Sequence, residues 1–283
     1  MPDFDHATMQ TQIRRLLRPR SVAIVGASAE PRTIGALILD NLLKMGFPGE
    51  VHLVSRSRSE IKGLRCVPTI DELPAGIDAI ALVVPEAAIA DSVAACARRQ
   101  AGGVIALAAG FAEMGEEGRA KQQQLANIAR NGHIALLGPN CIGMVNYRSR
   151  VALTFNNVDT LAPGERAGVG VIAQSGAMTG VVSNALTAQG LSLTSLISTG
   201  NEAVPRLEDY LEFLVDDEAT RVIVLFVEQV RDPRRFIELA ARARERGKPV
   251  VMMHPGRTER ARASGQSHTG ALAGNHAAMR ALL

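Results

Sequence analysis

The stretch "GVIAQSGAMTG", residues 170–180, joins an apolar run to a helical pattern through a turn of small residues. The apolar residues that end at Ala173 predict a buried strand, and Ser175 is a residue type that favours the first position of a helix. A strand followed at once by a helix is the repeating unit of parallel α/β sheets. This segment therefore predicts a doubly wound α/β fold.

The same alternation of short apolar runs and longer helical patterns extends along the whole chain. Before residue 156 the apolar runs are "SVAIVG", "VHLVS", "DAIALVV", "GVIALAA" and "HIALLG", with helical patterns near 34–46, 86–100 and 115–131. From residue 168 on they are "GVGVIAQ", "LTSLIS", "RVIVLFVE" and "PVVMMH", with helical patterns near 176–190, 206–214 and 233–246. The polar stretch between the two series predicts a Rossmann-like domain at 1–150 and a shorter flavodoxin-like domain at 151–283.

Length and composition place the chain among ordinary globular proteins. It has 283 residues, of which 47% are hydrophobic and 21% charged, and this is enough for two domains with their own cores. The longest apolar runs are far shorter than the roughly 20 residues that cross a bilayer, so we expect no membrane span. Residues 1–20 lack an apolar core followed by a small-residue cleavage site, which predicts a cytoplasmic protein.

Charge and cysteine content argue against several other classes. A formal charge of +3, with seven Phe, two Tyr and no Trp, argues against nucleic-acid binding but is compatible with a phosphorylated small molecule. We interpret the arginines between residues 14 and 20 as a solvated helix face. The three cysteines, Cys66, Cys96 and Cys141, lie far apart, which predicts neither a zinc site nor a disulfide framework.

The ends of the first two predicted strands carry nucleotide-like features. In "GASAEPRTIG", residues 26–35, Gly26 allows a tight turn and Ser28 offers a hydroxyl, so backbone N–H groups could face a phosphate at the helix start. The turn lacks the G-x-G-x-x-G pattern, so a plain strand-to-helix turn is an equal alternative. After the second strand, Arg56 and Arg58 stand where dehydrogenases place an acidic residue. They favour NADP or coenzyme A over a free ribose diol, and exposed loop arginines are the alternative.

Further strand ends add candidates in both domains. Asn140 and Cys141 close the fifth strand and are placed to line a pocket, although Cys141 also fits a buried structural thiol. In the second domain the N–H groups at the helix start of residues 175–177 would stabilise an anion, and an ordinary N-cap serine is the alternative. Glu228 ends an apolar strand and would lie at the same sheet edge, unless it is a solvated turn residue.

His268 lies in "GQSHTGALAGN", residues 265–275, among small and hydroxyl residues. An imidazole with an ordinary pKa is partly neutral and nucleophilic near pH 7, and its small neighbours would let a phosphoryl group reach the ring. From this pattern alone, an inert loop histidine is the alternative. The remaining histidines have no evident partners in the sequence.

Seven motifs stand in a fixed order from about Pro19 onward: "VAIVGAS", "AAGFAEMGEEG", "LLGPNCIGMVN", "VIAQSGAMTG", "STGNEA", "FVEQVRD" and "SGQSHTGALAG". Together they resemble the α part of the NDP-forming acyl-CoA synthetases, relatives of the succinyl-CoA synthetase α subunit. The resemblance implies that the first domain binds coenzyme A. It also implies that His268 becomes phosphorylated, that Glu228 orients it, and that Ser175, Gly176 and Ala177 hold the phosphoryl group. The coenzyme A contacts that it implies are Gly26, Ala27, Ser28, Val84, Pro85, Gly110, Asn140 and Cys141.

One position departs from the family pattern. Family members commonly have an Asn-Pro-Lys-like sequence after the second strand, whereas this chain has "SRS" at residues 55–57. We expect Arg56 or Arg58 to supply the missing positive charge. The acyl group would bind between the domains, near the small residues of "STGNEAV" at 198–204.

The resemblance implies a phosphoryl relay. Phosphate attacks an acyl thioester to give coenzyme A and an acyl phosphate, His268 takes up the phosphoryl group, and ADP receives it. ATP or ADP and Mg²⁺ would bind to an ATP-grasp domain or β subunit, in cis or in trans, and we expect an oligomer. The sequence stops inside an apparent last helix, "NHAAMRALL", so we expect a truncated α region without full synthetase activity alone.

Two other hypotheses compete with a synthetase part. A coenzyme A-sensing module of a protein acetyltransferase would share the fold, but such regulatory versions typically lose the histidine that this chain keeps at position 268. An NADP-dependent oxidoreductase would explain the Rossmann-like start. It would explain neither the second domain nor the histidine, so the synthetase hypothesis accounts for more of the chain.

Overall fold

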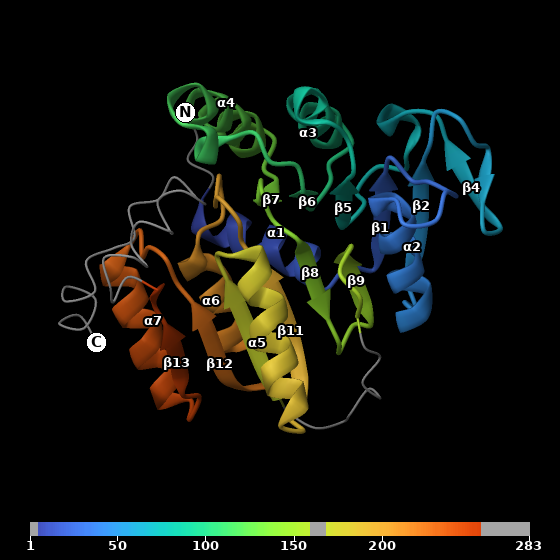
Figure 1. Cartoon of the computed structure of the whole chain (residues 1–283). Coiled ribbons are helices and arrows are strands. Elements are labelled where there is room, and N and C mark those ends of the chain that lie inside the picture. The colour runs from blue at the N-terminus through green and yellow to red at the C-terminus, as the bar shows by residue number, and fades with distance from the viewer. Residues whose placement is uncertain (1–4, 159–167, 256–283) are drawn as a thin grey trace.

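The computed structural model describes residues 5–158 and 168–255, and His268 lies outside these residues. Two sheets form the centre of the molecule, and helices pack against both (Figure 1). The strand order is β3-β4-β2-β1-β5-β6-β7 in the first sheet and β13-β12-β10-β11-β8-β9 in the second. The expected α/β class, a Rossmann-like domain followed by a flavodoxin-like domain, is confirmed.

The first sheet contains the five strands that the apolar runs predict. They are β1 (Ser21–Val25), β2 (Glu50–Val54), β5 (Ala79–Leu82), β6 (Gly103–Ala106) and β7 (Ala135–Leu137). All five run parallel, and strands buried on both faces read as continuous apolar runs because both faces need apolar side chains. The connecting helices are α2 (Ile34–Met45), α3 (Ile89–Arg98) and α4 (Glu116–Asn131).

Short elements complete this domain. Strand β4 (Leu64–Val67) extends the sheet beside β2, and β3 (Glu60–Ile61) pairs with it antiparallel. Three single turns of 3₁₀ helix lie in the loops: η1 (Ile70–Glu72), η2 (Glu86–Ala88) and η3 (Ala112–Met114). These elements are too short to show a hydrophobic period in the sequence.

The second sheet takes four parallel strands and a hairpin. Strands β10 (Gly168–Ala173), β11 (Leu193–Ser198), β12 (Thr220–Phe226) and β13 (Val250–Met253) are parallel, and α5 (Gly176–Ala188), α6 (Leu207–Asp216) and α7 (Pro233–Glu245) connect them or flank them. Strand β8 (Gly143–Asn146) pairs antiparallel with β11, and β9 (Val151–Thr154) pairs antiparallel with β8.

The β8–β9 hairpin joins the second sheet, because β8 pairs with β11. The chain thus reaches the second sheet at Gly143, and the domain boundary near residue 150 stays a prediction. The local sequence can predict the two strands of a hairpin, but it does not show which third strand the hairpin pairs with. That partner, β11, follows almost fifty residues later along the chain.

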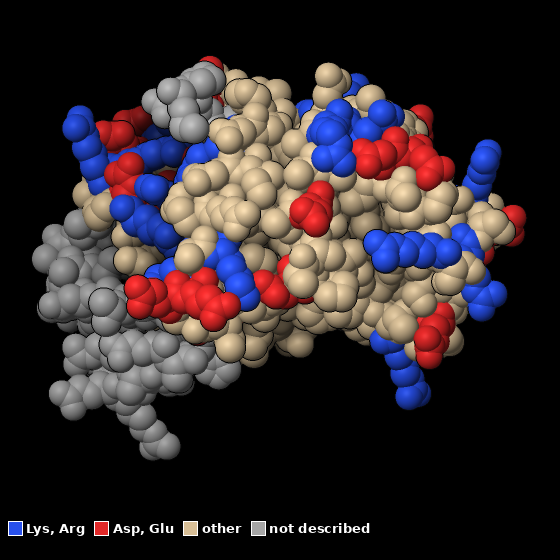
Figure 2. Space-filling model, turned by 90° about the horizontal axis from the view of Figure 1, so that it is seen from above, with Lys and Arg blue, Asp and Glu red and all other residues tan. Residues whose placement is uncertain are grey.

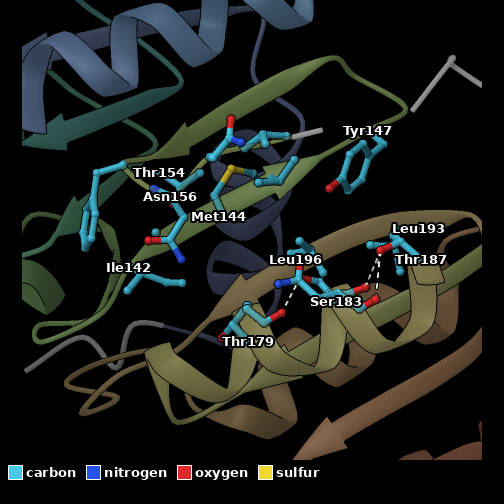
Figure 3. Close-up of a pocket in the computed structure, with 17 residues that line it drawn as sticks. Ile142, Met144, Tyr147, Thr154, Asn156, Thr179, Ser183, Thr187, Leu193 and Leu196 are labelled. Atoms are coloured by element: carbon cyan, nitrogen blue, oxygen red, sulfur yellow. Dashed lines mark hydrogen bonds between the residues drawn. The ribbon is translucent and has the colours of Figure 1, made fainter. Parts of the chain in front are cut away.

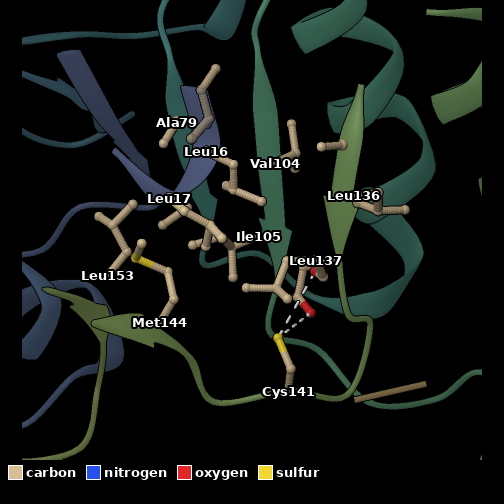
Figure 4. Close-up of a cluster of buried hydrophobic side chains, with 14 of the residues drawn as sticks. Leu16, Leu17, Ala79, Val104, Ile105, Leu136, Leu137, Cys141, Met144 and Leu153 are labelled. Atoms are coloured by element: carbon tan, nitrogen blue, oxygen red, sulfur yellow. Dashed lines mark hydrogen bonds between the residues drawn. The ribbon is translucent and has the colours of Figure 1, made fainter. Parts of the chain in front are cut away.

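Helix α1 (His6–Leu17) fills the space between the two sheets. Its buried residues Leu16 and Leu17 pack beside Val104 and Ile105 of β6, while Met144 and Leu153 of the hairpin close the cluster (Figure 4). One continuous apolar cluster therefore includes residues of both sheets. Each fully buried Leu stabilises the fold by about 1.5–3 kcal/mol, so the domains are held together by apolar burial.

Arg14, Arg18 and Arg20 are exposed, as expected for a solvated face, but Arg15 is half-buried and the arginines near α1 also form ion pairs. Arg15 Nε donates to Asp78 Oδ1 at 2.8 Å, and Arg18 pairs with Asp217 of the second domain. The Arg18 guanidinium also lies 5.2 Å from the centre of the Phe213 ring. Burial raises the pKa of Asp78, but the hydrogen bonds from Arg15 and from the Arg20 amide outweigh it and hold that pKa below its ordinary value. These side chains fasten α1 to both domains.

Among the described residues, no helix is both long and apolar enough to cross a membrane.

The carboxyl edges of the two sheets meet directly. The Asn201 amide donates to Pro139 O at 2.9 Å, and the Ala203 amide donates to Gly138 O at 3.0 Å. The loop after β11 thus rests on the loop after β7, and the carboxyl ends of these two strands come together at this contact.

Candidate functional site

The residues predicted to bind coenzyme A lie at one edge of the first sheet. Because β1, β2, β5, β6 and β7 are parallel, their carboxyl ends share that edge, where ligands bind in open α/β sheets. Each predicted residue follows one of these ends: Gly26, Ala27, Ser28, Arg56, Val84, Pro85, Gly110, Asn140 and Cys141. The fold thus brings together positions that span more than a hundred residues of sequence.

The turn after β1 requires two glycines. Gly26 has a φ of +85°, and a Cβ there would overlap the Val83 carbonyl oxygen. A Cβ on Gly35 would overlap the carbonyl oxygen of Gly26, so α2 starts in direct contact with the end of β1. The Thr33 side chain does not cap α2, and Ser28 Oγ accepts the Glu30 amide at 3.0 Å. The first amides of α2 are thereby available to an anion.

The loop after β6 is tied to the second domain. Glu113 Oε1 accepts the amides of Gly110 and Phe111 at 2.6 and 3.1 Å, and Glu113 Oε2 accepts Asn201 Nδ2 at 2.6 Å. Burial raises the pKa of Glu113, but the Asn201 and Gly110 donors outweigh it and lower that pKa overall. Gly110 is thus held in place from across the domain contact.

Cys141 does not offer its thiol to this edge. The side chain is 4% exposed and points into the core, where Sγ lies 3.5 Å from Ala106 O (Figure 4). Burial raises the pKa of the thiol to about 12. Of the alternatives that the sequence left open, the buried structural thiol is the observed one, and only the backbone of Cys141 can line a pocket. Its neighbour Asn140 is half-buried and donates through Nδ2 to Asn201 Oδ1 at 3.3 Å.

The start of α5 keeps accessible amides. Ser175 Oγ accepts the Met178 amide at 3.4 Å, so the ordinary N-cap bond is present and leaves the amides of Gly176 and Ala177 for other partners. A Cβ on Gly176 would lie 2.8 Å from Ile142 Cγ2. Ile142 therefore packs against the helix start, and it directly follows the Asn140–Cys141 pair of the first domain.

Gln174 joins three strand ends in the second sheet. Its Oε1 accepts the amides of Glu228 and Gln229 at 2.6 and 2.9 Å. Its Nε2 donates to Glu202 Oε1 at 3.0 Å and to Gln229 O at 2.8 Å. The ends of β10, β11 and β12 are thus connected through one buried amide. The strand-end logic that selected Ser175 and Glu228 passed over Gln174, although it stands next to Ser175.

Glu202 is a second acidic residue that the sequence analysis missed. It is 3% exposed, accepts Thr199 Oγ1 at 2.9 Å, and places Oε2 at 3.6 Å from Arg231 Nε. Burial raises its pKa to about 7, against the lowering effect of the Gln174 hydrogen bond and the Arg231 charge. We described the surrounding "STGNEAV" as small residues. The available signal was an acidic residue just after an apolar strand, the same signal that selected Glu228.

Glu228 follows β12 and is 8% exposed, and Gln174 fixes its backbone. Its predicted partner His268 lies outside the described residues, so the pair itself is not described.

Arg56 and Arg58 are both exposed after β2.

A charged cleft of about 360 Å³ lies between α4 and the loops after β11 and β12. Six charged side chains line it: Arg119, Arg130, Arg206, Arg231, Glu202 and Glu228. Figure 2 shows basic and acidic side chains gathered on the side of the molecule where α4 and α7 lie, the left in this view. Because the described lining has four cations and two acids, this cleft favours anions.

An uncharged groove of about 440 Å³ lies between α5 and the β8–β9 hairpin, with β11 as its floor. Ile142 and Thr179 lie at the end near the start of α5, and Tyr147 and Thr187 lie at the other end (Figure 3). The described lining contains no Lys, Arg, Asp or Glu. The groove thus reaches the first turns of α5 at Thr179, and the charged cleft reaches Gln174, just before the helix begins.

Comparison with known proteins agrees with this geometry. Residues 20–147 match the CoA binding domain, and residues 166–283 match the succinyl-CoA ligase like flavodoxin domain. A trans-feruloyl-CoA synthase, FCS1, from an unknown prokaryotic organism is 46% identical over 96% of this chain, which covers 39% of that protein. The α subunit of the ADP-forming acetate–CoA ligase I of Pyrococcus furiosus is 35% identical over 93% of this chain, which covers 57% of it.

A solved structure gives the same result. The dinucleotide forming acetyl-coenzyme A synthetase 1 of Ca. Korarchaeum cryptofilum, in complex with phosphate and ADP, superposes with a TM-score of 0.88 and 30% identity. The match covers 95% of this chain and 57% of that one. The chain thus spans between about two fifths and three fifths of the relatives named here.

A CoA-binding domain that docks onto a flavodoxin-like ligase domain defines the α region of acid–thiol ligases. Within that class, the chain belongs to the α part of the NDP-forming acyl-CoA synthetases.

Proposed function

We propose that this chain is the acyl- and phosphoryl-transferring part of an ADP-forming acyl-CoA synthetase. It would bind coenzyme A and interconvert acyl-CoA plus phosphate with acyl phosphate plus coenzyme A. His268 would then relay the phosphoryl group to ADP on an ATP-grasp partner, in cis or in trans, where ATP, ADP and Mg²⁺ bind. The observation that carries the proposal is the junction at Ile142, where the coenzyme A edge of the first sheet meets the start of α5.

The first step is thioester cleavage. An oxygen of phosphate attacks the acyl carbonyl carbon, the C–S bond breaks, and coenzyme A leaves as a thiolate that takes up a proton. The accessible amides of Gly176 and Ala177 and the positive end of the α5 dipole suit the oxygens of the attacking phosphate. Gly26 lets the turn after β1 pack directly against the Val83 carbonyl, and the uncapped first amides of α2 suit a phosphate of coenzyme A.

The second step moves phosphorus onto nitrogen. A ring nitrogen of His268 attacks the phosphorus of the acyl phosphate, the bond from phosphorus to the acyl oxygen breaks, and the free carboxylate leaves. An oxygen of the terminal ADP phosphate then attacks the phosphohistidine, and the P–N bond breaks to give ATP. A carboxylate at Glu228 would hold the ring in one tautomer and strengthen its nucleophilicity, as carboxylates do beside catalytic histidines.

The fixed position of Glu228 supports this role. Its backbone amide is bound by Gln174, which stands directly before the predicted phosphate-binding residues 175–177. The regulatory alternative gains no support from the relatives, which carry ligase and synthase names that range from acetate to 4-hydroxybutyrate and feruloyl. The cytoplasmic location and the oligomeric state stay predictions from the sequence.

The test is phosphohistidine labelling in the complete enzyme, with the ATP-grasp partner present. We expect γ-labelled ATP and Mg²⁺ to label the protein with an acid-labile, alkali-stable bond. His268→Asn should abolish the label, Glu228→Gln should slow labelling by about 100-fold, and the control His276→Asn should be labelled like wild type. Equal labelling of His268→Asn would overturn the relay. Calorimetry should show binding of coenzyme A and negligible binding of NADP.

A further inference from the structure

We propose that the uncharged groove holds the acyl chain of the substrate, and that this acyl group is a hydroxylated aryl acid of the 4-hydroxycinnamate class. The inference rests on the proposed function and names its substrate class. It places the acyl group away from the "STGNEAV" loop, where the sequence led us to expect it.

The position of the groove is the first argument. One end is formed by Ile142, which touches the start of α5 through Gly176, and by Thr179, one helical turn further on. Asn140 and Cys141, at the coenzyme A edge, directly precede Ile142. An acyl carbonyl at Ile142 would therefore have coenzyme A on one side and phosphate on the other, with its carbon chain in the groove.

The size of the groove is the second argument. It follows α5 from Thr179 to Thr187, and eight residues of α-helix rise about 12 Å. The volume of about 440 Å³ suits a ring joined to a short carbon chain and would leave acetate with almost no apolar contact. The groove runs between a helix and a hairpin, with Ile142 and Tyr147 at its opposite ends (Figure 3), and this length suits an extended acid.

The lining selects an uncharged, aromatic group. Tyr147 and Phe155 line the groove together with the largely buried Met144, Leu193 and Leu196, and the uncharged polar lining comes from Asn, Ser and Thr side chains. These two are a notable share of the nine aromatic residues in the chain, and aromatic pairs gain about 0.5–1.5 kcal/mol beyond their buried area. A dicarboxylic acid would bury its second carboxylate without a cation among the described lining residues, and such burial is strongly unfavourable.

The hydroxyl groups of α5 specify a donor on the ligand. Ser183 Oγ donates to Gly180 O at 3.0 Å, and Thr187 Oγ1 donates to Ser183 O at 3.0 Å (Figure 3). Each hydroxyl has thus spent its single hydrogen on the helix backbone and presents only lone pairs to the groove. A phenol O–H on the ring of the ligand can donate a hydrogen bond to these hydroxyl oxygens. An ether oxygen has no hydrogen and cannot donate to them.

The experiment uses the complete enzyme and measures binding of thioesters by calorimetry. Wild type should bind 4-hydroxycinnamoyl-CoA at least tenfold more tightly than acetyl-CoA, and more tightly than 4-methoxycinnamoyl-CoA. Gly180→Phe should remove this preference and leave coenzyme A affinity within twofold, because a Cβ at Gly180 meets only Asn156 Nδ2, at 3.8 Å, and the ring would enter the groove. The control Val181→Phe adds the same ring on the neighbouring residue, which is 57% exposed and does not line the groove, and should keep the preference.

Ser183→Leu provides a second blocking variant from another turn of α5. If both blocking variants keep the preference for the hydroxycinnamoyl group, or if wild type binds acetyl-CoA equally well, the groove is not the acyl site. If Gly180→Phe also loses coenzyme A, Ser183→Leu decides the question alone. If wild type binds no coenzyme A, the proposed function fails, and that outcome is distinct from loss of the aryl preference.

Discussion

The charged cleft and the uncharged groove lie near the two flanks of one strand-to-helix connection, the cleft at the end of β10 and the groove along α5. Gln174 lines the cleft and Thr179 lines the groove, only five residues apart along the chain. Four arginines and two glutamates line the cleft, whereas the described lining of the groove has no charge. The β10–α5 connection thus lies between a cleft that favours anions and a groove that has no charged lining residue.

The polar groups of the two cavities are also satisfied differently. In the cleft, side chains bind one another across three strand ends, as Gln174 does with Glu202 and the Glu228 amide. In the groove, hydroxyls bind the backbone of their own helix. Removing the side-chain hydrogen bonds of the cleft should therefore change the stability of the fold and its dependence on pH. Filling the groove with a larger side chain should change only which ligand binds. The following variants test the first half of that statement.

The largest effect is expected for Gln174→Leu. The substitution leaves the amides of Glu228 and Gln229 without their acceptor, and it removes one of the two hydrogen bonds to Glu202, which keeps the Thr199 hydroxyl. Each unsatisfied buried group costs about 1–3 kcal/mol, so we expect a loss of about 3 kcal/mol in the free energy of unfolding, measured with urea. The control Gln124→Leu, at an exposed position of α4, should stay within about 0.5 kcal/mol of wild type. A loss below 1 kcal/mol for Gln174→Leu would show that water replaces the network.

Glu202→Gln should change stability in a pH-dependent way. Burial raises the pKa of Glu202 to about 7, so the folded protein holds this proton more tightly than the unfolded chain does. Wild-type stability then falls as the pH rises from the ordinary glutamate value towards 7, where the buried carboxylate ionises. Gln carries no such charge. The variant should match wild type near pH 4 and exceed it by about 2 kcal/mol at pH 8, in urea unfolding at both pH values.

The matched control for this comparison is Glu218→Gln, at an exposed position. Its difference from wild type should be small and the same at both pH values. If Glu202→Gln is instead less stable than wild type at pH 8, the Arg231 ion pair outweighs the cost of burying the carboxylate. The charged groups of the cleft would then stabilise the fold. The cleft and the groove would differ in the charge of their lining but not in a cost to stability.

Sequence patterns predicted most of the fold because the central strands are buried on both faces. The runs that became β1, β5 and β10 are apolar throughout, and parallel strands of this kind are visible without knowledge of their partners. The predicted boundary after residue 150 falls between β8 and β9, because the sequence does not state that β8 pairs with β11. Pairing between distant strands depends on the whole topology.

The candidate site was predicted where one residue at a strand end carries the signal, as at Gly26, Ser175 and Glu228. It was missed where the feature depends on side-chain direction or on several distant residues. Cys141 follows a strand end, but its thiol points into the core. The groove is formed by α5 and by a hairpin that precedes α5 in the chain, so no local sequence pattern predicts the groove.

The smallest effect is expected for Asn201→Ala. This substitution removes the hydrogen bonds between the Asn201 side chain, at the cleft, and the first domain, which carries the coenzyme A edge. Asn201 Nδ2 donates to Glu113 Oε2 at 2.6 Å and to Gln122 Oε1 at 2.9 Å, so one side chain connects the loop after β11 with the first domain. Both acceptors keep other partners or reach the half-exposed surface, and the loss should be about 1 kcal/mol in urea unfolding. The control Asn127→Ala removes an exposed hydrogen bond from Gln123 and should be nearly neutral.

This variant also tests how the two cavities communicate. Because the Asn201 hydrogen bond lowers the pKa of Glu113, wild type gains stability from it above the ordinary glutamate pKa and loses that gain as the pH falls through the lowered value. Asn201→Ala should therefore differ from wild type at pH 7 and converge with it in acid. It should also weaken coenzyme A binding slightly, since Glu113 positions Gly110. An unchanged coenzyme A affinity would mean that α1 and the shared apolar cluster alone set the position of the coenzyme A edge relative to α5.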